Sequence, residues 1–474
     1  MCSKRTVGIA VGAIAMLTMA APVLSQETSG TDEVFKLTTV IGLNNTGLGN
    51  PGHVTTFFSF DISWVDPVLN KYYLADRSNK TIDILDLSKS PPTLTQVVNN
   101  GFAGFTGNND TSGPDGVATV NNHTEVWVGD NGGGGTGPGQ VWVLNADASV
   151  KTLPGGKANP ISVGGTTRAD EFCYDSKDNL VMVASPAESP PYVTFISTTS
   201  YTVVGTLVFD GKKGNGPNAT AGLEQCGWSP STGKFYINLP EVDGSGTGIA
   251  PGAIAVINPK NMKVEKLFPI PLEDCAHPQG MAIGPNDQIL EGCNAAGPNG
   301  SRNTVVVSAK NGSILAVLQD LGGADEVWFN EGDGHYIIPS CNTACRTIPG
   351  QFVITGPEVL GIVDANTLQR DQTVFVANQD PTVTSPAPPP NPRTIHGAAG
   401  DPNNKQIILP IPAVGGTAPH FNSSLCDMRG TGITVVPPMA TVSSVTGCIA
   451  ILAATLNNDT SSVAQERGKN SHQE

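Results

Sequence analysis

The stretch that decides the fold is Leu223-Glu224-Gln225-Cys226-Gly227-Trp228-Ser229-Pro230. Related strings, without internal gaps, occur seven times along the chain. In each, a polar residue follows a mostly apolar one, and small and apolar residues come next. A turn residue, often followed by Pro, stands five positions after the polar one. The polar heads are Asp61, Asp115, Asp170, Glu224, Gln279, Asp325 and His396. Such periodic recurrence indicates one structural unit repeated within a single architecture.

Short runs rich in Val, Ile and Thr follow each string and are typical of β-strands. Most units contain three such runs; in the second unit the outermost is expected at Val150–Leu153. The last unit ends with Gly447–Ala453 and lacks a fourth run, whereas Glu33–Ile41 near the N-terminus has no partner of its own. The sequence therefore predicts an all-β fold, a seven-bladed β-propeller of four-stranded blades. The N-terminal strand joins the last blade and closes the ring, which protects open edges.

Three segments are expected along the chain. Residues 1–25 combine Lys4 and Arg5 with an apolar run and small residues near Ser25, which is typical of a cleaved signal peptide. The alternative is an uncleaved anchor helix, because the apolar run is close to spanning length. Residues 33–455 form the single propeller, and residues 456–474 form a disordered tail. This organisation predicts a secreted or periplasmic protein with no membrane association after signal removal.

The charge and the cysteines fit an exported protein. The formal net charge is −15 and becomes more negative when Lys4 and Arg5 are removed, which argues against nucleic acid as a partner. An even number of cysteines remains after the signal, which favours disulfides. The expected pairs are Cys275–Cys293, Cys341–Cys345 and Cys426–Cys448. Cys173 and Cys226 lie on adjacent inner strands and form a fourth candidate pair if the blades approach closely enough.

The strand order also predicts where the loops lie. Since strands alternate in direction, the long connections share the face where the inner strands begin, and the short turns occupy the opposite face. Long loops are uncommon without a use. We therefore expect a monomer that binds a small-molecule substrate or ligand on the long-loop face. The five tryptophans lie in predicted strands and are expected to pack between blades.

The polar heads are expected to form a ring at the mouth of the central channel. Clustered carboxylates repel one another unless a cation neutralises them. Oxygen ligands of this kind suit a divalent cation, and Ca²⁺ fits best. The candidate metal ligands are Asp61, Asp115, Asp170, Glu224 and Asp325. The alternative is structural: the same side chains could bond backbone groups or contact channel water.

Two further stretches resemble known propeller families. Tyr73–Asp86 resembles an NHL-type repeat, and His277–Asp287 resembles the blade start shared by NHL, YVTN and gluconolactonase/regucalcin-like propellers. The latter enzymes bind a divalent cation, commonly Ca²⁺, at the channel mouth and open lactones or esters. The resemblance implies a similar site at the matching positions, which are Asp61, Asp170, Glu224 and Asp325. The chain departs from this family in blade number, since those enzymes have six, and in carrying Asp61 where they usually have Glu.

Three functions remain open from the sequence. The leading hypothesis is a metal-dependent hydrolase of a small lactone or ester. In that reading the cation polarises the carbonyl, and His396 and Asp325 are the candidate catalytic residues that activate water. The alternative is a non-catalytic ligand- or protein-binding propeller with a structural cation or none. The third hypothesis is a lyase or isomerase that uses His277 or His396 as its base.

Overall fold

A computed structural model of the chain describes residues 33–43, 57, 59–99, 101–247, 250–340, 359–376, 395–412, 426, 434–436 and 447–456. The predicted signal segment, the pair Cys341 and Cys345, and the predicted tail beyond residue 456 lie outside these residues. One compact unit extends over Val34–Thr455. No helix in the described part of the chain has the length and apolar character that crossing a membrane requires.

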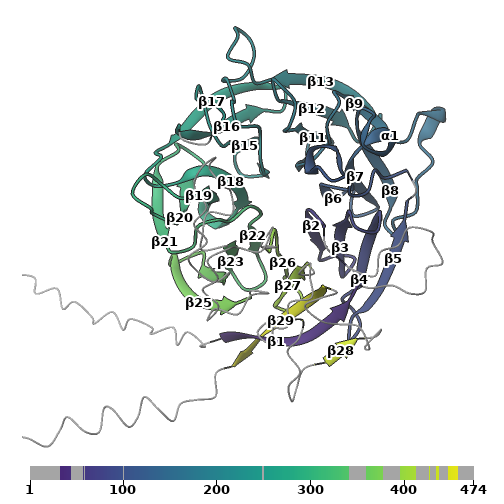
Figure 1. The fold of residues 1–474 in the computed structure, drawn as a ribbon, viewed down its shortest axis with the longest axis vertical. Helices are drawn as coiled ribbons and strands as arrows, with labels where there is room; N and C mark the ends of the chain where they lie inside the picture. Colours follow the sequence, from purple (N-terminus) through teal and green to yellow (C-terminus); the bar gives the residue numbers. More distant parts are fainter. Residues whose placement is uncertain are drawn as a thin grey trace, which may run out of the picture. The chain divides into compact units, whose positions relative to one another are not determined.

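Seven antiparallel sheets stand around a common centre, as Figure 1 shows, so the predicted seven-bladed propeller is confirmed. The first three blades run from inside to outside. Blade 1 comprises β2 (Ser63–Asp66), β3 (Lys71–Asp76), β4 (Thr81–Asp86) and β5 (Thr93–Val98). Blade 2 comprises β6 (Val117–Val120), β7 (Glu125–Asn131), β8 (Gly139–Asn145) and β9 (Ile161–Gly164). Blade 3 comprises β10 (Phe172–Asp175), β11 (Leu180–Ser185), β12 (Tyr192–Ser197) and β13 (Thr202–Val208).

The next three blades repeat this order. Blade 4 comprises β14 (Cys226–Ser229), β15 (Lys234–Leu239), β16 (Gly252–Asn258) and β17 (Lys263–Ile270). Blade 5 comprises β18 (Ala276–Ile283), β19 (Gln288–Ala295), β20 (Asn303–Ser308) and β21 (Ile314–Gln319). Blade 6 comprises β22 (Trp328–Asn330), β23 (His335–Ser340), β24 (Val359–Asp364) and β25 (Gln369–Phe375). Short helical turns lie between strands at α1 (Gly132–Gly135), η1 (Asn109–Thr111), η2 (Pro154–Gly156) and η3 (Pro285–Asp287).

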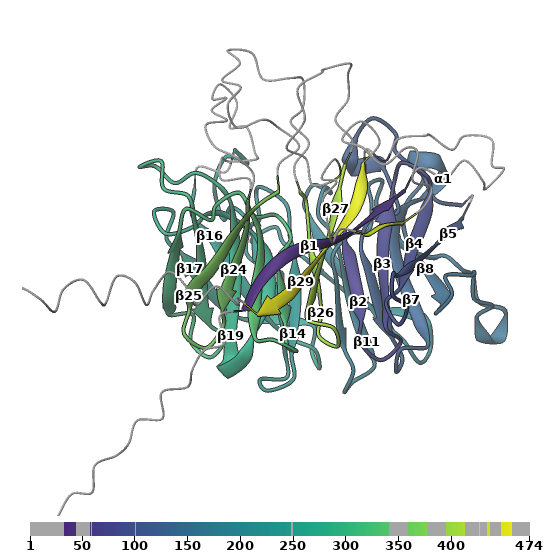
Figure 2. The ribbon, with the colours of Figure 1, turned by 90° about the horizontal axis from the view of Figure 1, so that it is seen from below.

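The seventh blade joins the two ends of the propeller. Its strands are β26 (Ala399–Asp401), β27 (Gln406–Ile411), β29 (Cys448–Leu456), β1 (Glu33–Gly42) and β28 (Thr434–Val436), in that order. Figure 2 shows β1 lying against β29, and side-chain hydrogen bonds run both ways between them, from Thr38 to Ile451 O (3.1 Å) and from Thr455 to Val34 O (2.9 Å). The N-terminal strand therefore closes the ring as predicted. The additional outer strand β28 pairs parallel with β1 and was not foreseen.

The core is divided among the blade interfaces. Seven apolar clusters are found among the described residues, and each joins two neighbouring sheets. The second strands contribute most, because they are covered on both faces; in β3, Tyr72, Tyr73 and Leu74 are all fully buried. Each blade thus buries its apolar side chains against both neighbouring blades, and these contacts stabilise the circular arrangement.

Small residues follow the polar heads because the inner strands approach closely. A Cβ added at Gly116 would come within 1.9 Å of the Asp170 carbonyl oxygen of the next blade. At Gly280 the equivalent contact, to Asp325 O, would be 2.7 Å. Real Cβ atoms do not approach other atoms this closely, so these positions accept only glycine. The small residues of the repeat thereby set the narrow diameter of the ring at this level.

The outermost strand of blade 2 lies further along the chain than predicted. The run around Val150 forms only an isolated bridge with Leu144, and the paired strand is β9. The turn at η2 explains the shift: Pro154 lacks an N–H donor and Gly155 adopts a left-handed conformation (φ 73°), so a regular ladder cannot continue through it.

Candidate functional site

One recurrent backbone bond places the polar heads in a ring. The residue at the head of the string donates its N–H to a carbonyl oxygen on the second strand of the same blade. These bonds join Asp61 to Ala75 (3.0 Å), Asp115 to Gly129 (2.9 Å), Asp170 to Ala184 (2.9 Å) and Glu224 to Asn238 (3.1 Å). Because the bond is the same in these four blades, their polar heads begin at equivalent places on the inner strands.

Arg77 joins two of the predicted metal ligands. Its Nη2 lies 2.6 Å from Asp61 Oδ2 and 2.5 Å from Asp115 Oδ1, and its Nε donates to Asp115 at 2.7 Å. All three side chains are almost fully buried. Two carboxylates flanking one guanidinium form a charge-assisted network in which they share a single positive charge.

Arg168 forms an ion pair with the polar head of the third blade. Its guanidinium lies 2.7 Å from Asp170 and 3.2 Å from Asp110, which sits in the loop before blade 2. Arg77 and Arg168 were both missed from the sequence, because neither falls at the repeated position. The available signal was their place in the chain: Arg77 directly follows the end of β3, and Arg168 stands two residues before Asp170. Both chain positions lie on the ring face.

His396 completes the ring between the first and sixth blades. Its Nε2 lies 2.9 Å from Asp61 and its Nδ1 lies 3.1 Å from Asp325. Burial alone would lower the pKa of His396, but Asp325 and Asp61 outweigh it and hold that pKa well above its ordinary value. With both nitrogens donating to carboxylates, the imidazolium binds two blades together. In this arrangement neither nitrogen is available to take a proton from a substrate.

The remaining acids differ in their readiness to ionise. Burial raises the pKa of Asp61, but Arg77 and His396 more than offset it, so the pKa lies below its ordinary value. Burial raises the pKa of Asp170 to about 6, with Arg168 opposing the shift. Burial and the neighbouring Asp325 raise the pKa of Glu224 to about 8. The ring thus holds fewer negative charges at neutral pH than its sequence suggests.

Three acids of the ring are buried. Asp61 and Asp170 are each only 3% exposed, and Asp115 is fully buried. Side chains in a water-filled channel would be exposed, so the ring residues must pack against one another. Asp325 and His396 are more accessible, with side-chain exposures of 21% and 30%.

The ring was also tested as a cation site. Asp61, Asp115 and Asp170 direct their carboxylates at arginine, and a divalent cation would have to compete with those guanidinium groups. No group of three or more His, Cys, Asp or Glu side chains within the described residues has an arrangement that could hold a metal ion. The residues in this arrangement do not fit the predicted Ca²⁺ site, and we derive no chemical step through a metal.

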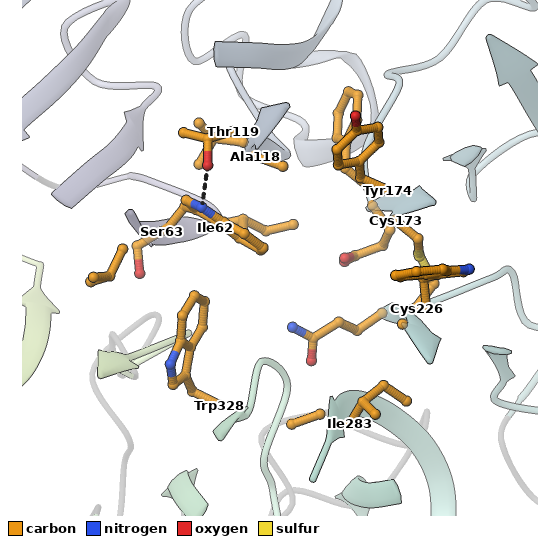
Figure 3. A pocket seen from close by; sticks show the side chains of 18 of the residues that line it. Ile62, Ser63, Ala118, Thr119, Cys173, Tyr174, Cys226, Ile283 and Trp328 are labelled. Atoms are coloured by element: carbon orange, nitrogen blue, oxygen red, sulfur yellow. Dashed lines mark hydrogen bonds between the residues drawn. A yellow bond between two sulfur atoms is a disulfide. The ribbon is translucent and has the colours of Figure 1, made fainter. Parts of the chain in front are cut away.

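A cavity of about 560 Å³ lies beneath the ring, inside the channel. Its aromatic walls come from Trp64, Phe172, Tyr174, Trp228 and Trp328. Trp64, Trp228 and Trp328 pack against the apolar clusters between blades, as expected, and also line this cavity. Figure 3 shows Tyr174 and Trp328 entering the cavity from different sides.

Trp64 and Trp328 meet edge to face, with ring centroids 5.3 Å apart. The Trp64 Nε1 donates to Thr119 Oγ1 at 3.0 Å, the bond drawn in Figure 3. Trp64 belongs to blade 1, Thr119 to blade 2 and Trp328 to blade 6. The two contacts therefore join different sheets and fix the shape of the aromatic wall. A rigid aromatic surface of this kind is a common feature of ligand pockets.

The end of the cavity next to the ring is polar. Glu171, Gln225 and Glu326 line it, and each directly follows a polar head of the ring. The carboxyl groups of Glu171 and Glu326, from blades 3 and 6, share a hydrogen bond. Burial raises the pKa of both well above the ordinary value, and the neighbouring acids raise it further. Gln225 is held by backbone N–H groups of Met281 (2.5 Å) and Val327 (3.2 Å).

The open end of the cavity lies at the short-turn face. Exposed Asn122 and Ser176, together with half-exposed His123 and Pro67, line it there. We expected ligand binding on the opposite, long-loop face. The exposed residues that line the cavity belong instead to the short turns. Most residues of the last two long loops lie outside the described part of the chain.

Three disulfides are present among the described cysteines. Cys275–Cys293 and Cys426–Cys448 are formed as predicted. Cys173 and Cys226 also pair, with Cα atoms 5.9 Å apart, and so join the inner strands of blades 3 and 4 beside the cavity. The narrow ring at this level explains why neighbouring blades are close enough for that bond.

Comparison with known proteins supports the fold alone. No protein-family model matches the sequence, and no curated protein is similar to it. A solved structure of RRP9 WD40 repeats has a TM-score of 0.53 at 7% identity, covering 89% of this chain and 100% of that chain. A structure of a mitotic checkpoint complex scores 0.49 at 10% identity, covering 84% and 95%. Kuenenia stuttgartiensis hydrazine synthase scores 0.43 at 13% identity, covering 64% and 74%.

Of these three structures, the RRP9 structure has a TM-score above 0.5, and at 7% identity the likeness supports a β-propeller fold and no function. The resemblance to NHL and gluconolactonase-like propellers stays a prediction, and so does secretion.

Proposed function

We propose that this chain is a non-catalytic binding propeller that takes one small molecule in its central cavity from the short-turn face. The observation that carries the proposal is the cavity itself, which has aromatic walls, polar side chains next to the ring and exposed residues at the short turns. Its volume of about 560 Å³ falls within the range of pockets for small ligands, which are mainly apolar with a few placed polar groups.

The arrangement of polar groups supports binding more than catalysis. His396 has both ring nitrogens engaged with carboxylates, and Asp61 and Asp115 are held by Arg77. These groups are committed to joining blades and are separated from the cavity, whose lining includes none of them. A hydrolytic site needs its base within reach of the reacting atom.

A binding screen tests this proposal. Melting temperature and tryptophan fluorescence are measured with a panel of neutral alcohols, γ- and δ-lactones and organic ammonium ions. At least one class should raise the melting temperature of the native protein. Trp328→Ala should weaken that binding at least tenfold, since it removes part of the cavity wall. Trp142→Ala is the matched control, because Trp142 lies outside the cavity. The proposal fails if no compound binds, or if both variants bind equally.

The hydrolase and its cation remain separate predictions. The same lactones are assayed for ring opening with and without added Ca²⁺, and the purified protein is analysed for metal by mass spectrometry. Turnover that depends on Asp325 and His396 would favour the hydrolase over the binding propeller. A tightly held metal whose removal lowers the melting temperature would support the ring as a cation site.

A further inference from the structure

We infer that the ligand of the central cavity is an organic cation of the alkylammonium class, which places its charge between the glutamates and the aromatic walls. This inference rests on the proposed function, since it names the ligand of the same cavity. It follows from the combination of residues that meet there, and no one of them would carry it alone.

The first element is the acidic end. Glu171 and Glu326 are both more than nine-tenths buried and line the cavity. Neither forms an ion pair with a described residue, whereas Asp61, Asp115 and Asp170 in the ring above are all paired with arginine. Among the described residues that line the cavity none is Lys or Arg. The two carboxyl groups share a hydrogen bond and burial raises the pKa of both, so the free pair holds a proton, and a cation bound beside it would stabilise its ionised form.

The second element is the aromatic wall. A cation over the face of Trp, Tyr or Phe is attracted by the negative face of the ring, and Trp gives the strongest attraction. The cavity is lined by Trp64, Trp228 and Trp328, with Tyr174 and Phe172 completing the wall. A cation–π contact is stronger when it is shielded from water, so several such faces around one cavity favour a cation over a neutral molecule of the same shape.

The third element is the open end, which does not repel a cation. His123 lies there, but its Nδ1 is paired with Asp66 at 2.7 Å. Asp66 is fully buried, and its carboxylate offsets a positive charge on this histidine. The strongly negative chain, with a formal net charge of −15, also raises the local concentration of cations. The chemistry that fits all three elements is a compact ammonium group carrying an apolar substituent.

A pair of matched probes tests the inference. Choline carries a trimethylammonium group, and 3,3-dimethylbutan-1-ol has the same shape without the charge. Binding of each to the native protein is measured by calorimetry and by tryptophan fluorescence. We expect choline to bind at least tenfold more tightly than the alcohol.

Two variants of the cavity separate charge from fold. Glu326→Gln and Glu171→Gln keep the size of the side chain, and each should weaken choline binding about tenfold while leaving the alcohol unchanged. Glu291→Gln is the control, because Glu291 is a fully buried acid outside the cavity lining. Melting curves show which variants are folded. If Glu326→Gln is unstable, Trp228→Phe, which retains an aromatic face, and Trp228→Leu, which does not, make the same comparison.

The outcomes are distinguishable from failure of the proposed function. Equal binding of choline and the alcohol, or choline binding that is unchanged in both glutamine variants, would overturn the inference but leave a small-molecule cavity in place. Binding of neutral lactones without any binding of choline would have the same meaning. If no member of the wider panel binds, the proposed function itself is wrong.

Discussion

Arg77 is the residue whose removal should matter most to the ring. It is 2% exposed and contacts Asp61 and Asp115 at 2.6 and 2.5 Å, so Arg77→Gln leaves the buried Asp115 without its ion-pair partner and leaves Asp61 with His396 alone. Breaking a buried ion pair from one side costs about 3–5 kcal/mol, because the remaining charge stays buried and unpaired. We expect a loss of that size in the free energy of unfolding, measured by urea denaturation.

The matched control is Arg370→Gln, at an exposed arginine on β25. It should change the free energy of unfolding by less than about 1 kcal/mol, since exposed ion pairs contribute little. Equal effects of the two substitutions would show that the Arg77 network does not stabilise the fold.

The raised pKa of Glu224 predicts how the free energy of unfolding depends on pH. Burial and Asp325 raise its pKa from 4.5 to about 8, so between these values the folded state binds more protons than the unfolded chain. By linkage, the free energy of unfolding must then fall as the pH rises from about 4.5 to about 8. In Glu224→Gln this fall should be shallower, since the amide does not titrate.

Urea denaturation at several pH values measures the effect, and Glu331→Gln, at an exposed acid, serves as the control. A slope that is identical in the native protein and Glu224→Gln would mean that Glu224 ionises in the folded state as freely as in the unfolded one.

At the scale of strands, the disulfide Cys173–Cys226 ties β10 of blade 3 to β14 of blade 4. It closes a loop of 53 residues, whereas Cys275–Cys293 closes one of 18 within blade 5. The chain-entropy relation gives about 4 kcal/mol for the longer loop and about 3 kcal/mol for the shorter one. Replacing each pair by alanine should therefore destabilise the protein by several kcal/mol, more for the cross-blade pair. Denaturation of both double variants checks the order, and the reverse order would contradict the entropic account.

The strands show which features a sequence can predict. The seven inner strands were predictable because one pattern, a polar head followed by small residues, recurs with little change. The ring geometry follows from it, since the same backbone bond recurs at Asp61, Asp115, Asp170 and Glu224. The outermost strand of blade 2 was misplaced because a turn at Pro154 delays it, and strand patterns carry no information about such a delay.

The site was less predictable than the fold. Arg77 and Arg168 stand at positions that do not recur from unit to unit, so periodicity could not assign them to the ring. Without these arginines, the acids appeared to lack positively charged partners. The cavity was missed for another reason: Trp228 and Trp328 pack between blades and also line the channel, and a strand pattern predicts only the first of these contacts. Contacts of this kind depend on how neighbouring blades are arranged and cannot be predicted from a single stretch of sequence.

For the molecule as a whole, closure of the ring depends on β1. This strand lies between β29 and β28, and its Phe35, Val40 and Ile41 are 2%, 1% and 0% exposed. Burying a large apolar side chain contributes about 1.5–3 kcal/mol, so these three supply about 5–9 kcal/mol, which is comparable to the whole stability of a typical domain. The side chain of Gln372 also clamps the backbone of Phe35, accepting from its N–H at 2.8 Å and donating to its carbonyl at 3.0 Å.

A protein that begins after residue 43 should therefore lose its cooperative unfolding transition and associate through the exposed edge of β29, as seen by calorimetry and size-exclusion chromatography. A synthetic peptide of residues 33–43 added in trans should restore the monomer and the transition, because it supplies the missing strand without a covalent link. A peptide with Val40→Lys and Ile41→Lys is the control and should not restore them, since the buried positions cannot accept charge. If the truncated protein melts like the intact one, the ring is closed by the remaining strands, and the N-terminal strand only covers an edge.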